Sequence, residues 1–370
     1  MTLAAQRANR LGAIQDEMRR QEVDLLVIGP SSNLRYALGF RALATDRLTA
    51  LLVSQDAAVM LMPDFESPEF VAATSFENVA PWADRDGPSR GVREAFERLP
   101  GLPSDPRTLV DDELPFQFFT HLRGRLGRDP GLASSLIGEL RLVKSSEEQQ
   151  RIERTGAVIS EAIDLAQERA EPGMTELQLK RLLEAFLWDA GSDTVDYVLV
   201  QAGSNSAAPH HTAGDDLLRE GEPVLVDIAV CLDGYFADIT QQTFLGDPTP
   251  EYKAAYEAVH AAQLAGVSAA RAGALVEDVA AAASSVLAAR GYADWSGPRT
   301  GHGLGADVHE APSVVEGNTV ALAPGNVITV EPGVYLPGLW GIRIEDTVVV
   351  TDGDPGVVTR GSRPLHARAF

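Results

Sequence analysis

Two aspartates interrupt apolar stretches that otherwise predict buried β-strands. Asp227 lies within VLVDIAV (224–230), and Asp238 lies within YFADITQQTF (235–244). Aspartate is depleted in strand interiors, and burying a carboxylate without a partner costs considerable free energy. The Asp233-Gly234 turn predicts a hairpin that places the two carboxylates nearly opposite each other on one face. Facing carboxylates repel unless one is protonated or a cation lies between them, so the pair indicates a cation site. A solvated face is the alternative, and the apolar neighbours disfavour it.

A second pair of strands repeats this pattern with glutamates. Glu331 lies inside VITVEPGVYL (327–336) and Glu345 inside GIRIEDTVVV (341–350). Arg343 lies two residues before Glu345 and therefore on the same face of the strand. A buried Arg–Glu salt bridge could account for one of the glutamates. It would not readily account for all four acids, so the second hairpin also favours a cation site.

The stretch GHGLGADVHE (301–310) contains two histidines, His302 and His309. A phosphate-binding loop is disfavoured, since the GK[ST] sequence and a strand–GxGxxG–helix context are both missing. The HExxH zinc motif also fails, because Ser313 occupies its last position. One imidazole from His302 together with four carboxylates suits two divalent cations, such as Mn, Co, Fe or Zn, better than a structural zinc.

The elements that must position these residues divide into two predicted domains. Residues 1–140 predict a small α/β domain, with a helix over 7–21 and strands over 24–29, 49–54 and 57–63. Residues 141–370 predict an α+β domain, in which pairs of strands are separated by helices. Two of its predicted helices follow Ser145 and Thr175, each of which has a capping-box partner three residues later. A third begins at Thr249-Pro250, and a fourth covers about 275–289.

Composition narrows the class of function. The chain has 370 residues and a formal net charge of -22, with 53 acidic against 31 basic residues. This balance argues against binding to nucleic acid or to anionic membranes, both of which need basic patches. Cys231 is the only cysteine, which predicts a reducing and hence cytoplasmic location. The first 30 residues carry no long apolar core, so neither a signal peptide nor a membrane span is predicted.

The order of these motifs resembles a known family. VDIAV, ADIT, TGHGLGADVHE, TVEPG and RIED follow one another as in the pita-bread metallopeptidases. That family includes methionine aminopeptidase, prolidase and aminopeptidase P, with creatinase as a metal-free relative. Residues 23–40 resemble the N-terminal domain of the creatinase and prolidase group, and residues 139–156 resemble its interdomain junction. The resemblance therefore implies a pita-bread catalytic domain behind a creatinase-like N-terminal domain.

The resemblance also implies roles for individual residues at the metal site. It implies that Asp227 binds one metal, that His302 and Glu331 bind the other, and that Asp238 and Glu345 bridge the two. Arg343 would orient the metal-bound carboxylates. The implied cofactors are two divalent ions, with manganese among the candidates.

The family's substrate-side residues also have counterparts here. Glu331 would move the proton during hydrolysis, while His210 and His309 would contact the substrate. His211 is interpreted as a solvent-exposed neighbour of His210. The implied partners are short peptides and a second copy of the chain in a homodimer.

Several positions depart from the family pattern. Ala229 replaces a usual glycine, Gln241-Gln242 replaces one arginine and predicts a bulge, and Pro298 replaces a histidine of some members. Ser313 stands where prolidases often carry an arginine that binds the carboxylate of a dipeptide. This loss favours an Xaa-Pro type aminopeptidase over a prolidase. A broad-specificity aminopeptidase without a proline requirement is a further alternative. A metal-free creatinase-like hydrolase and an inactive binding module are more remote alternatives.

Overall fold

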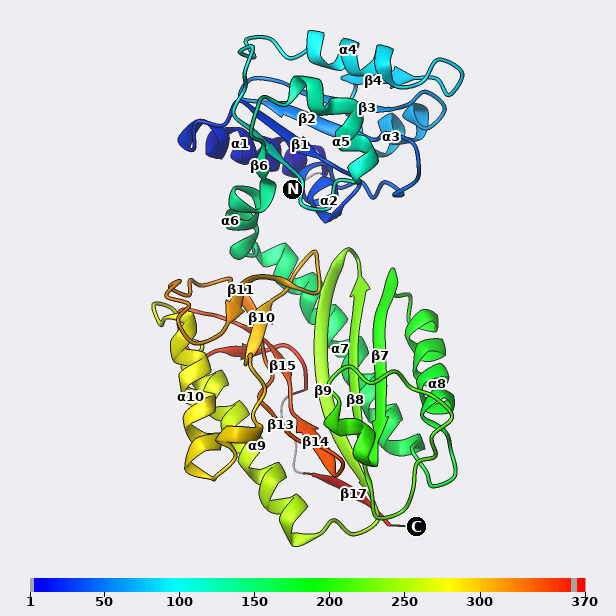
Figure 1. Ribbon diagram of the computed structural model, residues 1–370, viewed down its shortest axis with the longest axis vertical. Helices are drawn as coiled ribbons and strands as arrows, with labels where there is room; N and C mark the ends of the chain where they lie inside the picture. The colour runs from blue at the N-terminus through cyan, green and yellow to red at the C-terminus, as the bar shows by residue number, and fades with distance from the viewer. Residues whose placement is uncertain (1–2, 361–364, 370) are drawn as a thin grey trace. The chain divides into compact units, whose positions relative to one another are not determined.

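The computed structural model describes residues 3–360 and 365–369. The chain forms two compact units, Met1–Arg141 and Leu142–Phe370. Helices and strands alternate in the first unit, and helix pairs are followed by groups of strands in the second (Figure 1). Among the described residues, no helix is both long enough and apolar enough to cross a membrane.

The first unit is built on one six-stranded mixed sheet with the order β4-β3-β2-β1-β5-β6. Its strands are β1 (Leu25–Ile28), β2 (Ala50–Ser54), β3 (Ala58–Pro63), β4 (Val79–Trp82), β5 (Thr108–Val110) and β6 (Gly131–Leu132). Its helices are α1 (Leu3–Arg20), α2 (Ser32–Leu38), α3 (Ser67–Thr74), α4 (Ser89–Glu97), α5 (Phe116–Leu122) and α6 (Ile137–Leu142), the last ending one residue into the second unit. Successive residues of β1 to β3 enter two separate apolar clusters, because helices cover both faces of the sheet.

The helices of the second unit begin where their capping residues predict. They are α7 (Ser146–Arg169), α8 (Glu176–Asp189), α9 (Pro250–Ala269) and α10 (Val276–Ala289). Ser145 and Glu148 form a reciprocal capping box at α7, and Thr175 does the same with Gln178 at α8. These bonds satisfy amide groups that have no partner within the helix, so they fix the first turn.

Three sheets fill the second unit. The first has the order β17-β9-β8-β7, the second β11-β10-β12-β15-β16, and the third pairs β13 with β14. The strands are β7 (Thr194–Ala202), β8 (Pro223–Leu232), β9 (Tyr235–Leu245), β10 (Gly301–Gly303), β11 (Glu310–Val314), β12 (Val327–Val330), β13 (Gly333–Leu336), β14 (Trp340–Arg343), β15 (Asp346–Val349), β16 (Gly356–Val357) and β17 (His366–Arg368). Figure 1 shows α7 and α8 beside β7 to β9, and α9 and α10 beside the later strands.

The first predicted hairpin forms, and its register is set by the two-residue turn. Leu232 pairs with Tyr235, so Asp227 faces Thr240 and Asp238 faces Ala229. The two aspartates share a face but are not directly opposite, because the Ile228–Ile239 pair lies between their two positions. The bulge predicted at Gln241-Gln242 is wrong. The ladder continues there without a shift, because the additional residue lengthens β9 and both glutamines remain paired and buried.

The second predicted hairpin is divided at its glutamates. Residues 327–336 form β12 and β13, with Glu331 in the break between them. Residues 341–350 form β14 and β15, with Glu345 in the corresponding break. Pro332 follows Glu331 and cannot donate a backbone hydrogen bond, which is consistent with an interruption of the strand there. β12 pairs with β15 and β13 with β14 in different sheets, so both carboxylates lie at a crossover.

Candidate metal centre and substrate pocket

Residues from both hairpins meet at one point inside the second unit. Potential ligand atoms of Asp238, His302 and Glu345 all lie within 4.8 Å of one another. Nε2 of His302 is 3.8 Å from Oδ2 of Asp238 and 3.4 Å from Oε1 of Glu331. Residues more than 100 positions apart in the chain therefore form one group of candidate ligands.

Three of the carboxylates are bonded to the protein in the same way, through one oxygen only. Oδ2 of Asp227 accepts a hydrogen bond from Nη2 of Arg343 at 2.5 Å. Oδ2 of Asp238 accepts one from the Tyr197 hydroxyl at 2.6 Å. Glu345 accepts one at Oε2 from Thr240, also at 2.6 Å.

The second oxygen of each of these carboxylates is buried and has no partner among the described residues. These atoms are Oδ1 of Asp227, Oδ1 of Asp238 and Oε1 of Glu345. Buried polar atoms are nearly always hydrogen-bonded, so three such exceptions in one place require an explanation. Carboxylate oxygens together with an imidazole nitrogen form a donor set that fits divalent cations.

The pKa shifts of these carboxyl groups also indicate that the group lacks a compensating positive charge. Burial and the nearby Asp227 raise the pKa of Asp238 well above its usual range. Burial and the neighbouring Asp238 do the same for the pKa of Glu345, and burial also raises the pKa of Glu331. Without a compensating charge these carboxyl groups therefore favour the protonated form.

His302 is held in its neutral form. Burial lowers its pKa to about 3. Nδ1 lies 3.0 Å from the carbonyl oxygen of Gly303, so Nδ1 carries the ring proton and donates it to that oxygen. Nε2 is then unprotonated and carries a lone pair. That lone pair faces Asp238 and Glu331, so the ring presents the nitrogen that a metal would need.

Arg343 lies beside these carboxylates, but it does not form the buried Arg–Glu salt bridge that the sequence offered as an alternative. It binds Asp227 and neither Glu331 nor Glu345. Nε also donates to Thr240 at 3.1 Å and Nη1 to the Tyr335 hydroxyl at 2.9 Å. The guanidinium thus connects the two hairpins and fixes the orientation of one carboxylate.

A cavity of about 630 Å³ opens beside the carboxylates. Its lining includes both predicted substrate-side histidines, His210 and His309, and the ring of His309 lies 4.3 Å from that of His302. Burial and the nearby Arg299 lower the pKa of His309. The volume lies within the range of about 300–1,000 Å³ that is usual for small-molecule sites.

Four further residues contact the predicted ligands or Arg343, and the sequence analysis did not identify them. Thr240 and Thr329 each lie two positions from a candidate ligand, so the alternation rule applied to Arg343 could have found them. Thr329 contacts Glu331 at 3.3 Å and accepts the amide of His302 at 3.0 Å. Tyr335 lies four positions after Glu331 in the same predicted strand, so the same rule could have found it. Tyr197 comes from β7, and no spacing in the sequence connects it to the site.

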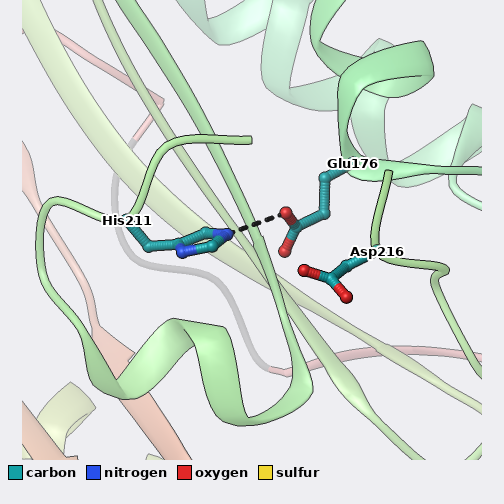
Figure 2. A group of neighbouring side chains, drawn as sticks. All are labelled: Glu176, His211 and Asp216. Atoms are coloured by element: carbon teal, nitrogen blue, oxygen red, sulfur yellow. Dashed lines mark hydrogen bonds and ion pairs between the residues drawn. The ribbon is translucent and has the colours of Figure 1, made fainter. Parts of the chain in front are cut away.

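The segment that carries His210 is anchored by a buried glutamate. Figure 2 shows Glu176 beside His211 and Asp216, and Nε2 of His211 lies 2.9 Å from Glu176. Glu176 is fully buried and also accepts hydrogen bonds from the amides of Ala202 and Gly214 and from the Asn205 side chain. His211 is therefore half-buried and bonded, and its interpretation as a solvent-exposed neighbour is wrong.

A buried glutamine holds the same segment from the strand side. Nε2 of Gln201 lies 3.2 Å, 3.1 Å and 3.4 Å from the carbonyl oxygens of Ala208, Pro209 and His211. Both backbone neighbours of His210 are thus held by one amide group. Because four donors already satisfy Glu176, its group with His211 and Asp216 acts as an anchor for this loop and not as a second metal site.

Comparison with known proteins agrees with this geometry. Residues 150–352 match metallopeptidase family M24, and residues 10–143 match the creatinase/prolidase N-terminal domain. A protein of Mycobacterium tuberculosis named "Probable dipeptidase PepE" is 37% identical over 332 residues, which cover 88% of this chain and 87% of that protein.

Solved structures of two relatives have the same architecture throughout. Dipeptidase PepE from Mycobacterium ulcerans has a TM-score of 0.91 and 34% identity, covering 99% of both chains. A prolidase from Thermococcus sibiricus has a TM-score of 0.89 and 29% identity, covering 98% of this chain and 99% of the other. The family resemblance and the mixed α+β fold class predicted from sequence are confirmed. The chain belongs to metallopeptidase family M24 and is a hydrolase of the exopeptidase class.

Proposed function

We propose that the chain is a dinuclear metal-dependent exopeptidase that acts on short peptides, with dipeptides as its main substrates. The observation that carries this proposal is the set of three buried carboxylate oxygens that have no partner among the described residues, in the same group as Nε2 of His302. Asp227, Asp238, His302, Glu331 and Glu345 would hold the ions, and Mn, Co and Zn all suit such ligands. A metal-free creatinase-like reaction is disfavoured, because it would leave these acids without compensation.

The chain's own residues would divide the work of hydrolysis. When bound, two divalent ions would supply an activated water and polarise the scissile carbonyl. Glu331 would accept the proton of the water and deliver it to the leaving amine, a role that its raised pKa supports. His210 and His309 would donate hydrogen bonds to the carbonyl oxygen as charge develops on it. Arg343 would keep Asp227 in one orientation throughout.

The relatives support the choice of dipeptides. Two of them carry the word dipeptidase in their names and a third is named a prolidase, each matched over most of its length. Ser313 favours the second candidate, an Xaa-Pro type aminopeptidase on longer peptides. We also propose a domain boundary near residue 140, a homodimer and a cytoplasmic location. The two compact units support the domain boundary. The family resemblance supports the homodimer, and the lone cysteine supports the cytoplasmic location.

A substrate panel tests the proposal. Xaa-Pro, Xaa-Ala, Xaa-Pro-Yaa and Xaa-Ala-Yaa peptides are offered to enzyme loaded with Mn, Co or Zn, after metal removal by a chelator. Metal-dependent release of the N-terminal residue, fastest from the dipeptides, is the expected result. Cleavage restricted to the tripeptides would replace the dipeptidase assignment with the aminopeptidase. Turnover of creatine without metal would overturn the peptidase assignment.

A further inference from the structure

Two arginines line the pocket, and only one of them is available to a ligand. Arg343 is 5% exposed, and its three guanidinium nitrogens already contact Thr240, Tyr335 and Asp227. Arg299 is 39% exposed. Since both guanidinium groups are permanently charged, Arg299 is the accessible cation among the arginines of the pocket wall.

The backbone around Arg299 is fixed although its side chain is open. The carbonyl oxygen of Thr300 accepts the amide of Glu331 at 2.7 Å. Two residues before Arg299, the amide of Gly297 donates to the carbonyl oxygen of Gly333 at 3.1 Å. A charged side chain on a fixed backbone loses less conformational freedom when it binds a ligand, so this segment is preorganised.

The guanidinium of Arg299 has most of its donors unused. Among the described residues its side chain makes one ion pair, in which Nη2 lies 3.7 Å from Oε1 of Glu331. That distance is longer than a hydrogen bond, and a guanidinium carries five N–H donors. The contact nevertheless places the cation next to the residue proposed to move the proton. A negatively charged substrate group bound beside the reacting bond would lie within its reach.

We propose that Arg299 binds the C-terminal carboxylate of a dipeptide substrate and thereby makes the enzyme prefer dipeptides to longer peptides. This inference rests on the proposed function. In a dipeptide the carboxylate lies one residue beyond the scissile bond, at most about 3.3–3.6 Å of extended chain. The group that binds it must therefore stand beside the catalytic residues, where Arg299 is found. A guanidinium fork also matches the two oxygens of a carboxylate.

The other interpretation is that Arg299 serves Glu331 alone. Its charge acts to lower the pKa of that carboxyl group, and such an effect would influence every substrate equally. The two interpretations separate when the same peptide is offered with and without its terminal charge. The test therefore compares Ala-Pro or Ala-Ala, whichever the wild-type enzyme cleaves faster, with the C-terminal amide of the same dipeptide.

The variant Arg299→Gln removes the charge and keeps a polar side chain. Wild-type enzyme should cleave the free acid with a kcat/KM at least about tenfold above that of the amide. A hydrogen bond to a charged group contributes roughly 1.5–3 kcal/mol, so Arg299→Gln should lower kcat/KM for the acid by about 10- to 150-fold, mainly through KM. The ratio of acid to amide should fall to near one. Arg299→Lys, which keeps the charge without the fork, should retain an intermediate ratio.

The ratio is measured within one preparation, so partial loss of active enzyme cancels. Binding of a dipeptide analogue with a reduced scissile carbonyl, as acid and as amide, gives a calorimetric readout that does not need turnover. The matched control is Arg290→Gln, which removes one exposed charge outside the pocket wall and should preserve the ratio. An equal loss for acid and amide, or no loss for either, would overturn the assignment. Wild-type enzyme that cleaves only tripeptides would instead overturn the proposed function, before any variant is compared.

Discussion

Nη2 of Arg343 lies 2.5 Å from Oδ2 of Asp227, while Oδ1 of the same carboxylate is buried and has no partner among the described residues. The two residues are 116 positions apart and come from different hairpins. One oxygen is thus held by the protein and the other is left for a ligand. In the same way, the Tyr197 hydroxyl donates to one oxygen of Asp238 and the Thr240 hydroxyl to one oxygen of Glu345. Three carboxylates of the site therefore share this arrangement.

Arg343→Gln should weaken binding of the metal held by Asp227. Loss of the residue that orients a metal-binding carboxylate typically costs 10- to 100-fold in affinity. Calorimetric titration of metal-free enzyme should therefore show one weakened site, together with a lower kcat. Arg360→Gln is the matched control, since Arg360 pairs with Asp164 in a largely exposed ion pair. Two unchanged sites in Arg343→Gln would contradict the orienting role.

Replacing a candidate bridging carboxylate by its amide should abolish both metal binding and hydrolysis. Asp238→Asn and Glu345→Gln keep size but remove one ligand charge each. The same changes should make the melting temperature of the metal-free protein less dependent on pH, because each removes a buried group that must otherwise lose a proton as the pH rises. Metal content by mass spectrometry and thermal unfolding measure the two effects. Full activity in either variant would rule out the dinuclear site.

The metal-free protein should lose stability as the pH rises. The pKa values of Asp238, Glu331 and Glu345 are raised in the folded state, so at mildly acidic pH the folded protein holds more protons than the unfolded chain. Their contribution to stability is complete below the unfolded carboxyl pKa of about 4 and is lost as the pH rises through the folded values.

Each proton of difference lowers the free energy of unfolding by about 1.4 kcal/mol per pH unit. Thermal unfolding of metal-free protein between pH 5 and pH 8 measures this slope. Metal-loaded enzyme is the control and should show a smaller loss, because bound cations replace the protons. A melting temperature of the metal-free protein that rises across this range would contradict the raised pKa values.

Glu176→Gln should disturb catalysis without removing metal. All four partners of Glu176 approach it as donors, and an amide in its place would set one donor against another. Such a mismatch lowers the free energy of unfolding by about 1–3 kcal/mol and would loosen the loop that carries His210. We expect kcat to fall severalfold at unchanged metal content. Asp215→Asn is the control, because Asp215 is a neighbouring exposed acid whose side chain contacts neither Glu176 nor its four donors. Wild-type kinetics in Glu176→Gln would show that the anchor does not matter for His210.

The sequence by itself determined which residue types must meet. Acids inside apolar runs cannot be buried without compensation, and the turn at Asp233-Gly234 brings two of them onto one face. Capping residues also marked where α7 and α8 begin. These inferences depend on local rules, namely strand alternation, turn chemistry and the cost of burying charge, which act over a few residues.

Only the tertiary structure decided how those residues are used. The break at Glu331-Pro332 and the matching break at Glu345 send each strand into a second sheet, which no alternation pattern predicts. Packing between distant strands gave Arg343 its partner and brought Tyr197 to Asp238. It also left Arg299 open in the pocket wall. Such contacts depend on how three sheets lie against one another, and residue spacing along a single strand carries no information about that.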